Sequence, residues 1–299
     1  MPPSCAPPDP MANFKHYYIP QTLSSALEVL QNAPGKSRLI AGGSDLLLEL
    51  QQGHHPPVDN LVDINGIPEL QRLEIVDDCL IVGAAVPLKR IATAEMVNQH
   101  ASALQDACAL VGGPQVRNTA TLGGNVSHAL PAADGMIALM ALQPVVRIFS
   151  PEGVRDARLH TLFQGPGKST LTSFEIVTDF RLPLKLEGQA SAFARIMRPQ
   201  GVALPILNLA MWLERDGDVI RNCRIAVGPA GPVPILCTGA AEMFAGAVPN
   251  SEKIGVAAEA LLEQVRYRSS PRRASAEYRK HITADLLREV VQKAWNRSF

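Results

Sequence analysis

The first segment whose residue types could do chemistry is a pair of glycines between two apolar runs. Ile40-Ala41 precedes Gly42-Gly43, and Ser44-Asp45-Leu46 follows, which predicts a strand that ends in two glycines and then opens a helix. Such a turn points several backbone N–H groups at one spot, with the helix dipole behind them, and no Cβ keeps a phosphate away from the amides. We expect the Asp45 carboxylate to cap the helix, because it would repel a phosphate.

A second glycine pair lies further along the chain. It belongs to Thr119-Ala120-Thr121-Leu122-Gly123-Gly124-Asn125, and Pro131-Ala132-Ala133-Asp134 follows after a short gap. Two threonine hydroxyls, an amide side chain, bare glycine amides and a carboxylate therefore stand close together. Donors and acceptors at this density can satisfy a phosphorylated, polyhydroxylated ligand.

Neither glycine pair carries a standard nucleotide fingerprint. No lysine follows Gly43, so this segment is not the GxxxxGK[ST] phosphate loop, and no GxGxxG occurs. A tight strand–helix turn is the alternative interpretation of the first pair, and a loop that caps a helix starting at Pro131 is the alternative for the second. A ligand site therefore requires that Gly43 and Gly124 converge in space on one cleft.

The elements that must position these pairs are predicted from hydrophobic periodicity. A helix over 24–30, capped by Thr22 or Ser24, and strands over 38–41 and 58–64 make a β-α-β-like unit. The pattern then predicts, in chain order, a strand over 77–85, helices over 88–96 and 102–110, a non-periodic segment over 112–125, a helix that starts at Pro131, a hairpin over 145–157 and a strand over 176–182.

A polar stretch over 184–190 marks a domain boundary. Beyond it, an antiparallel meander with an Asp216-Gly217 turn is followed by helices; the expected ranges are strands 192–197, 204–215 and 219–227 and helices 239–245, 251–267 and 274–295. The expected domains are a lead-in over 1–11, disordered because of its PP and DP pairs, a first domain over 12–186 with subdomains of about 12–64 and 65–186, and a C-terminal α+β domain over 187–299.

Composition excludes several classes of protein. The 299 residues are 46% hydrophobic and 19% charged, which suffices for a packed core. Lys plus Arg and Asp plus Glu number 28 each, and a net charge of zero argues against nucleic acid as a partner. No apolar run approaches the roughly 20 residues of a membrane span, and the start does not resemble a signal peptide. The five cysteines are scattered without a CxxC, which indicates no metal site and reduced thiols in the cytoplasm.

The motifs together resemble a known family. IAGGSDLL at 40–47, VGGPQVRNTATLGGN at 111–125 and PAAD at 131–134 resemble the FAD-binding (medium) subunit of the molybdenum hydroxylases, the xanthine dehydrogenase and carbon monoxide dehydrogenase family. The C-terminal half resembles it at 191–193, 223–234 and 273–281, so the likeness spans roughly 12–295. Gly165-Pro166-Gly167-Lys168 is closest to the xanthine dehydrogenase branch. The implied fold is α+β: a two-part vanillyl-alcohol-oxidase-like FAD-binding domain, then a small domain with an antiparallel sheet and a helix bundle.

The resemblance implies FAD as the cofactor and a set of residues that hold it. The first glycine loop would wrap the pyrophosphate, the second would contact the flavin and its phosphates, and Asp134 would hydrogen-bond the cofactor. Leu110 and Val177 stand where the family has apolar contacts, and Arg195 stands near a position that is often lysine. The implied FAD-binding residues are Leu39, Ile40, Ala41, Gly42, Gly43, Ser44, Asp45, Leu46, Leu110, Thr121, Leu122, Gly123, Gly124, Asn125, Asp134, Val177 and Arg195.

The resemblance also implies electron transfer in a complex. Partners would be an iron–sulfur subunit, which supplies electrons one at a time, and a molybdopterin-binding large subunit, which oxidises a substrate such as a purine or another N-heterocycle. FAD would pass the electrons to NAD+ or another acceptor. We expect no catalytic side chain and no metal ligand in this chain, and the cysteine-rich insertion of the 4-hydroxybenzoyl-CoA reductase type is absent from the sequence.

Two other functions stay open at this point. One is a stand-alone flavin-dependent dehydrogenase or reductase, in which a small organic donor reduces FAD directly. The other is a maturation or scaffolding homologue that has lost the flavin, against which both intact glycine pairs count. A flavin contact is one interpretation of His128 and an ordinary loop histidine the other, whereas the basic residues between 266 and 280 are interpreted as surrounding a helix connection.

Overall fold

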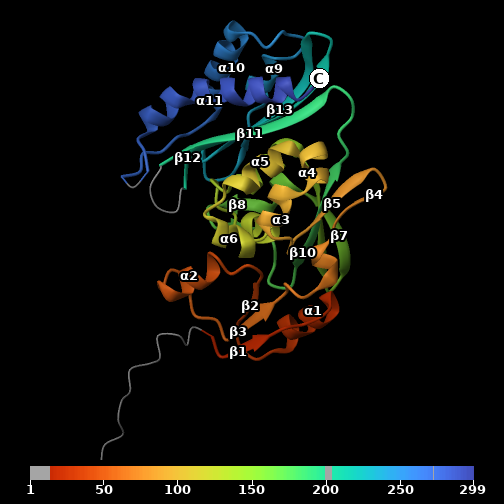
Figure 1. Cartoon of the computed structure of the whole chain (residues 1–299). Coiled ribbons are helices and arrows are strands. Elements are labelled where there is room, and N and C mark those ends of the chain that lie inside the picture. Colours follow the sequence, from red (N-terminus) through yellow and green to blue (C-terminus); the bar gives the residue numbers. More distant parts are fainter. Residues whose placement is uncertain (1–13, 199–203, 272) are drawn as a thin grey trace, which may run out of the picture.

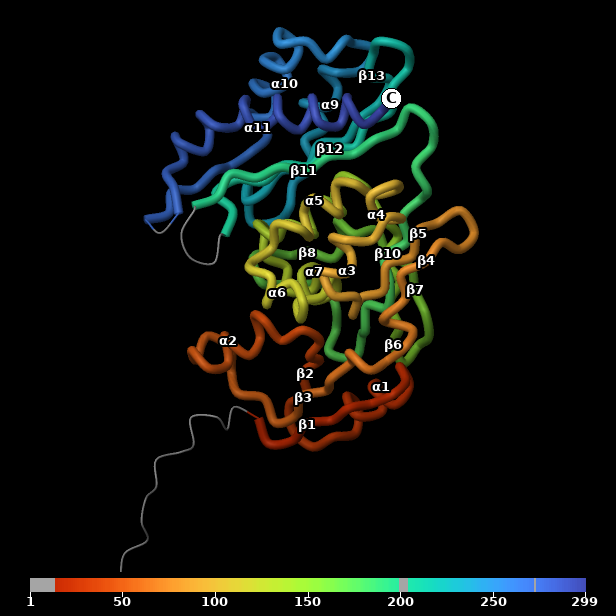
Figure 2. Tube along the Cα trace, viewed as in Figure 1, coloured from red at the N-terminus to blue at the C-terminus, as the bar shows by residue number. Residues whose placement is uncertain are grey.

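The structure is a computed structural model that describes residues 14–198, 204–271 and 273–299. Figure 1 shows three lobes stacked end to end, which we call the N-terminal lobe (14–71), the middle lobe (73–183) and the C-terminal lobe (189–299). The tube in Figure 2 shows the chain passing through them in sequence order. The lead-in predicted over 1–11 lies outside the described residues.

The N-terminal lobe is a small parallel sheet with helices. The strand order is β1-β3-β2, and β3 pairs in parallel with both of its neighbours. Parallel neighbours need a crossover connection, and α2 lies in the connection from β2 to β3. Thr22 caps α1 by accepting from Ser25 N, and Ser25 returns the bond in a capping box. The elements are β1 (His16–Tyr18), α1 (Leu23–Asn32), β2 (Ser37–Ile40), α2 (Leu46–Gln51), β3 (Asn60–Asp63) and the 3-10 helix η1 (Pro68–Gln71).

The middle lobe packs six helices against a five-stranded antiparallel sheet of order β4-β5-β10-β6-β7. The helix α8 is buried along its whole length, so its apolar residues fill the lobe's core. The elements are β4 (Leu73–Val76), β5 (Cys79–Gly83), α3 (Leu88–Thr93), α4 (Glu95–His100), α5 (Ser102–Leu110), α6 (Pro114–Thr119), α7 (Leu122–Ser127), α8 (Asp134–Leu142), β6 (Val145–Ser150), β7 (Gly153–Arg158), η2 (Leu159–Leu162), β8 (Phe163–Gly165), β9 (Lys168–Ser169) and β10 (Ile176–Pro183).

The C-terminal lobe is a four-stranded antiparallel sheet of order β11-β12-β13-β14. Side chains on its strands alternate between two cores: Ala210 faces the middle lobe, whereas its neighbours Leu209 and Met211 face α10 and α11. A sheet buried on both faces explains the long apolar run of β12. The elements are β11 (Gln189–Met197), β12 (Pro205–Asp216), β13 (Val219–Gly228), β14 (Ile235–Leu236), α9 (Thr238–Glu242), α10 (Ser251–Gln264) and α11 (Ala276–Asn296).

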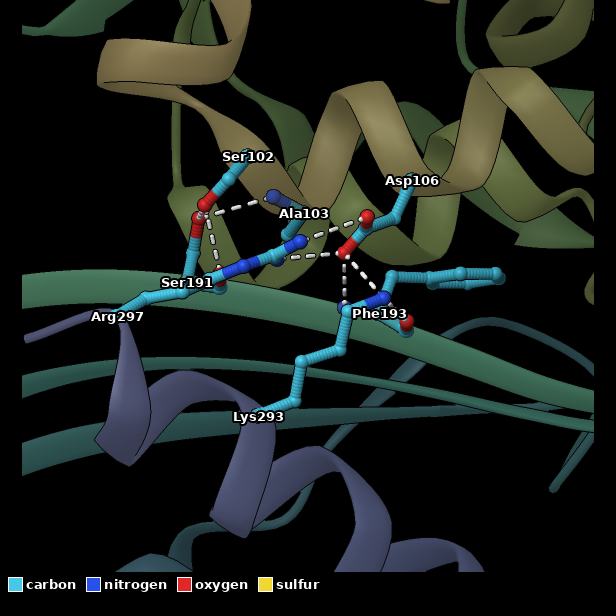
Figure 3. A network of polar contacts seen from close by, with 7 residues as sticks. All are labelled: Ser102, Ala103, Asp106, Ser191, Phe193, Lys293 and Arg297. Atoms are coloured by element: carbon cyan, nitrogen blue, oxygen red, sulfur yellow. Dashed lines mark hydrogen bonds and ion pairs between the residues drawn. The ribbon is translucent and has the colours of Figure 1, made fainter.

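A polar network holds the middle lobe to the C-terminal lobe (Figure 3). Asp106 on α5 takes two hydrogen bonds from Arg297, at 2.7 and 3.0 Å, and pairs with Lys293 at 3.0 Å. The backbone N–H of Phe193 on β11 donates to the same carboxylate at 3.2 Å. Because this one carboxylate on α5 accepts from donors on β11 and at the C-terminal end of α11, the three elements are fixed relative to one another.

Four details differ from the sequence predictions. The helix expected over 88–96 breaks at Ala94, because Ile91 and Val97 are both fully buried and a spacing of six would put them on different faces of one helix. The segment 112–125 is not irregular: it contains α6 and α7. Signals for both existed, in Pro114 at the first turn of α6 and in Thr121, which caps α7.

The other two differences concern β4 and α8. Sequence periodicity missed β4, whose Ile75 and Val76 are exposed. The helix expected from Pro131 begins at Asp134 instead, since the carbonyl of Ala132 accepts a hydrogen bond from Asn208 at 3.0 Å and holds the preceding residues against β12.

The expected α+β fold with an antiparallel sheet in its C-terminal part is confirmed. No strand of the described residues crosses the domain limits that we propose at about 64 and 186. None of the helices in the described part of the chain is both long and apolar enough to cross a bilayer.

Candidate functional site

One large cavity is lined by residues of all three lobes. Its volume is about 670 Å³, within the range of cofactor-sized pockets. Gly43 of the N-terminal lobe and Gly124 of the middle lobe both line it, so the expected convergence of the two glycine pairs is confirmed. Arg195 and Pro205 from the C-terminal lobe complete the lining. A site built by three lobes depends on their relative placement, and the Asp106 network fixes the middle lobe relative to the C-terminal lobe.

The first glycine pair forms a wall of backbone amides, which we call the amide wall (residues 41–46). The N–H groups of Gly42, Gly43, Ser44 and Asp45 donate to no described residue. Gly43 has φ +66°, a conformation that glycine adopts without strain. The side chain of Asn65 donates to the carbonyl of Ala41 at 2.8 Å and anchors the loop. Unpaired N–H groups that converge on a cavity are suited to an anion.

The other glycine of this pair serves packing. A Cβ on Gly42 would overlap the carbonyl oxygen of Thr119, so only glycine allows the loop to lie against the junction of α6 and α7. The expectation that Asp45 caps α2 is wrong, because its side chain makes no capping hydrogen bond and is exposed. The carboxylate therefore stands at the cavity with no structural partner beyond a 3.5 Å contact from Ser44.

The second glycine pair differs from the expectation of bare amides. The N–H of Gly123 donates to the carbonyl of Ala84 at 2.8 Å, and that of Gly124 donates to the Thr121 hydroxyl at 3.2 Å. Added at Gly123, a Cβ would come within 2.7 Å of Ala84, so this glycine also serves close packing. The amides of this loop are therefore used within the protein.

In the second loop, side chains provide the groups that are available to a ligand, because the glycine amides are already hydrogen-bonded within the protein. Asn125 accepts from Met136 N at 3.2 Å through its Oδ1, and its Nδ2 has no described acceptor and is available to the cavity. Thr121, Asn125, Asp134 and Arg195 all line the cavity. We call these four residues the side-chain wall. It presents a hydroxyl, an amide and a guanidinium where the amide wall presents backbone.

Asp134 and Arg195 form a buried ion pair, each with a side chain 3% exposed. Arg195 also donates to the carbonyl of Leu110, and the Asp134 Oδ1 accepts from Asn208 at 2.7 Å. Burial raises the pKa of Asp134 to about 6, although Arg195 and Asn208 both act to lower it. The Nε of Arg195 and the Oδ1 of Asn208 have no described partner. Both oxygens of Asp134 are thus occupied by protein donors, and its role is to hold Arg195 at the cavity.

Of the remaining residues predicted to bind FAD, some line the cavity and others do not. Leu39, Ile40, Leu46 and Val177 line the cavity and supply apolar surface. Leu122 does not, because its side chain is fully buried in the core of the middle lobe. The side chain of Leu110 is also absent from the lining, and this residue contributes only its carbonyl, to Arg195.

Sequence reasoning did not assign several lining residues to the site. They include Arg38 on β2, Leu48 on α2, Ser169, the stretch 171–173, and Arg268 and Arg273 in the segment before α11. The signals available in advance were the Ser/Thr content of 169–173 and the place of Arg273 at the start of the family-like segment 273–281. His128, which the sequence left open, lines the cavity, and its Nε2 lies 3.3 Å from Glu49 of α2. This pair links the two glycine loops across the site.

The residues present fit FAD. Unpaired amides can hold a pyrophosphate, and the glycines let backbone approach it closely, while Leu39, Ile64 and Val177 provide apolar surface for a ring system. Among the residues described, no group of three or more His, Cys, Asp or Glu side chains is placed to hold a metal ion.

Comparison with known proteins identifies two family matches. Residues 12–185 match the FAD binding domain in molybdopterin dehydrogenase, and residues 191–294 match the CO dehydrogenase flavoprotein C-terminal domain. Together these matches cover the amide wall, the side-chain wall and most of the C-terminal lobe.

Similar proteins share nearly the full length. The chain is 30% identical to the xanthine dehydrogenase FAD-binding subunit of Escherichia coli O157:H7 over 95% of this chain and 97% of that protein. It is 30% identical to the nicotine 6-hydroxylase medium subunit of Paenarthrobacter nicotinovorans, over 94% and 98%. A structure of carbon monoxide dehydrogenase from Hydrogenophaga pseudoflava superposes with a TM-score of 0.89 at 23% identity, covering 95% of this chain and 98% of that one, which shows the shared fold.

Proposed function

The chain belongs to the molybdopterin dehydrogenase family as its FAD-binding component, and on this premise we propose that it is the electron-exit subunit of a heteromeric molybdenum hydroxylase. FAD is its cofactor, and the chain is a component of an oxidoreductase. The observation that carries the proposal is the single cavity lined by both glycine loops, with the unpaired amides of residues 42–45 on one side.

The residues of the chain act by binding and orienting. The amide wall would hold the pyrophosphate with backbone N–H groups, which require no counter-charge from a side chain. Val177 and Ile64 would shield the ring from water, and Asp134 holds the Arg195 guanidinium in place. When bound, FAD supplies a centre that takes up electrons one at a time and releases two together. None of these roles is an acid–base step on an organic substrate.

The partners and the substrate are part of the proposal. We infer an iron–sulfur subunit as the electron source and a molybdopterin-binding large subunit as the site of substrate oxidation. The xanthine and nicotine named for two relatives favour an N-heterocycle, and a xanthine dehydrogenase-like complex is the specific hypothesis. NAD+ is the proposed acceptor. The free thiols of Cys79, Cys108, Cys223 and Cys237 support a cytoplasmic location.

The test is purification of the tagged full-length chain from its native host, followed by flavin and metal analysis of whatever copurifies. We expect an absorbance band of bound FAD near ~450 nm, together with iron, molybdenum and two further subunits. The matched control is the Gly42→Ala chain, in which the added Cβ displaces the amide wall and should remove flavin from the complex. Purification without flavin would contradict the proposal.

A second assay distinguishes the proposed electron-exit subunit from a stand-alone flavin-dependent dehydrogenase. The full-length chain loaded with FAD and free of partners is offered xanthine or nicotinate anaerobically, and the flavin band is followed. Under the proposal the band persists, because oxidation of the heterocycle takes place on another subunit. Rapid bleaching by the substrate alone would favour the stand-alone enzyme.

A further inference from the structure

Two arginines line the cavity from the C-terminal lobe. Arg268 and Arg273 lie in the segment between α10 and α11, and Leu204 and Pro205 of the same lobe also belong to the lining. In Figure 1 the beginning of α11 and the neighbouring ends of β11 and β12 lie well above α2, with α6 between them. FAD carries its negative charge on its pyrophosphate, which the amide wall is placed to hold. The two arginines are therefore left without a charge to balance.

No protein carboxylate balances them within the described residues. Neither Arg268 nor Arg273 forms an ion pair there. The adjoining undescribed residues, Pro-Gln-Gly-Val-Ala at 199–203 and arginine at 272, add no acidic residue to the sequence. The other cavity-lining carboxylates in C-terminal and middle lobes are already paired, Asp134 with Arg195 and Glu175 with Arg155.

Further guanidinium groups crowd the same place. Arg198 donates through Nε to the carbonyl of Arg273 at 3.1 Å. Arg279, 2% exposed, donates to the carbonyl of Ile206, and its Nε has no described partner. Burial lowers the pKa of Arg273, and the neighbouring Arg268 lowers it further; burial and then Arg273 do the same to Arg279. Cations gathered in this way repel one another unless an anion lies between them.

We propose that Arg268 and Arg273 are the docking site for the phosphates of a pyridine dinucleotide, which accepts electrons from the cofactor. This inference rests on the proposed function, in which the chain passes electrons out of the complex. Arginine binds phosphate through two parallel hydrogen bonds, and Arg268 is exposed while Arg273 is half-buried, so a ligand can arrive from solvent. A neutral acceptor such as a quinone or oxygen would have no use for these charges, whereas a dinucleotide combines a reacting ring with an anionic handle.

The chain's balanced charge strengthens the assignment. With 28 basic and 28 acidic residues, the molecule as a whole exerts little pull on an anion. A local cluster at the cavity therefore supplies both the steering and the selectivity. Sequence analysis interpreted these basic residues as surrounding a helix connection; the placement of Arg268 and Arg273 on the cavity gives two of them a further role.

The test runs the electron transfer in reverse, from NADH to FAD, in the full-length chain loaded with FAD. Under anaerobic conditions the dihydronicotinamide of NADH loses a hydride, FAD gains that hydride together with one proton from water, and NAD+ leaves. Bleaching of the flavin band is measured against NADH concentration in wild type, Arg268→Gln, Arg273→Gln, Arg273→Lys and Arg266→Gln. Arg266 is the matched control: it is exposed and close in sequence, but donates to the carbonyls of Glu263 and Val265 and does not line the cavity.

We expect both glutamine variants to raise the apparent Kd for NADH at least tenfold while the limiting rate stays within twofold. The Arg273→Lys variant, which keeps the charge, should lie between wild type and Arg273→Gln, and Arg266→Gln should match wild type. Added salt should weaken NADH binding to wild type more than to the double glutamine variant. FAD content and the midpoint potential of the bound flavin should be equal in all variants.

Three outcomes would overturn the inference. An unchanged apparent Kd in both glutamine variants would show that the arginines do not hold the dinucleotide. A shifted midpoint potential with an unchanged Kd would show that they act on the flavin instead. A wild-type chain that binds FAD but is not reduced by NADH would reject a dinucleotide acceptor. Failure to bind FAD at all is a different result, because it rejects the proposed function.

Discussion

The amide wall and the side-chain wall line the same cavity, but the first offers backbone N–H groups and the second offers side chains. In the amide wall, the N–H groups of residues 42–45 donate to no described residue, and all four residues line the cavity. In the second loop, Gly123 and Gly124 give their N–H groups to Ala84 and Thr121, and the ligand meets the side chains of Asn125 and Arg195. The same Gly-Gly sequence therefore binds through backbone in one place and positions side chains in the other.

The difference comes from what lies behind each loop. Strand β5 continues into Ala84, whose carbonyl stands where the Gly123 N–H can reach it at 2.8 Å. Around the amide wall no described carbonyl oxygen accepts from the N–H groups of residues 42–45, not even that of Thr119, which lies against Gly42. A buried N–H group is paired wherever an acceptor is in reach, so the tertiary neighbour decides which loop keeps its donors for a ligand.

The largest effect is expected from Arg195→Met, which breaks the side-chain wall at its charged centre. The substitution leaves Asp134 buried without its cation, at a cost of about 3–5 kcal/mol in the free energy of unfolding. Urea unfolding of the FAD-free chain measures it.

The control for Arg195→Met is the double variant Arg195→Met/Asp134→Leu. It removes both charges and should recover most of the loss, since Asn208 keeps its bond to the carbonyl of Ala132 at 3.0 Å. A double variant as unstable as the single one would mean that shape, and not charge, is what this site requires.

Gly42→Ala and Gly123→Ala separate packing from binding. Each added Cβ meets backbone that is held in place, the Thr119 carbonyl for Gly42 and Ala84 for Gly123, so each should cost about 1–3 kcal/mol in stability. Only Gly42→Ala moves unpaired donors, so only it should weaken FAD binding by more than tenfold. Fluorescence titration with FAD gives the affinities.

Gly255→Ala serves as the control for both glycine variants. This helical glycine has nothing within 4 Å of the added Cβ, and alanine there should stabilise the chain by about 0.5–1 kcal/mol with unchanged FAD affinity. Equal losses of FAD affinity in Gly42→Ala and Gly123→Ala would contradict the contrast between the walls.

The sequence alone predicted most of the helices and strands that position the two walls. Thr22 at the start of α1 and the Asp216-Gly217 turn between β12 and β13 are local signals, and each predicted its element closely. The break at Ala94 could not be predicted, because it follows from the burial of both Ile91 and Val97 in one core and no local breaker marks it.

The site was predictable in its residues but not in their roles. Both glycine pairs were singled out, yet whether an amide is bare depends on a carbonyl from a distant strand, such as that of Ala84. Asp134 was expected to meet the cofactor, whereas its partner Arg195 lies 61 residues away in sequence and occupies it. Arg268 lies in no motif, and the resemblance at 273–281 did not give Arg273 a role in the site. Their role depends on which charges the fold leaves unpaired.

Asn125→Asp tests the side-chain wall without disturbing its frame. Aspartate keeps the oxygen that accepts from Met136 N but replaces the Nδ2 donor with a negative charge facing the cavity. FAD affinity should fall about tenfold, the value of one charged hydrogen bond, while the urea midpoint changes little. Unaltered affinity would place the ligand out of reach of Asn125.

The ionisation of Asp134 gives the side-chain wall a pH dependence that the amide wall lacks. Burial raises its pKa to about 6, above the ordinary value of about 3.9, so the folded chain takes up a proton first as pH falls. Its contribution to stability therefore grows as pH drops from about 6 to about 4, by about 2 kcal/mol, and is lost as pH rises through 6.

The pH prediction is measured as the difference in unfolding free energy between wild type and Asp134→Asn at pH 5 and pH 7. Wild type should gain on the variant at pH 5. The opposite trend would mean that the attraction of Arg195 outweighs burial and holds the pKa of Asp134 below its ordinary value.

The smallest effect is expected at the amide wall itself, from Asp45→Asn. The Asp45 carboxylate is exposed, makes no capping bond and lines the cavity beside amides that would hold a pyrophosphate, so it repels the ligand across solvent. Removing the charge should tighten FAD binding by about two- to threefold at low salt, and the gain should disappear near ~0.5 M salt, because exposed charges are screened. Titrations of both proteins at two salt concentrations measure this, and stability should not change. If Asp45→Asn instead weakens FAD binding at every salt concentration, the carboxylate accepts a hydrogen bond from the ligand, and the amide wall, like its counterpart, also recognises FAD through a side chain.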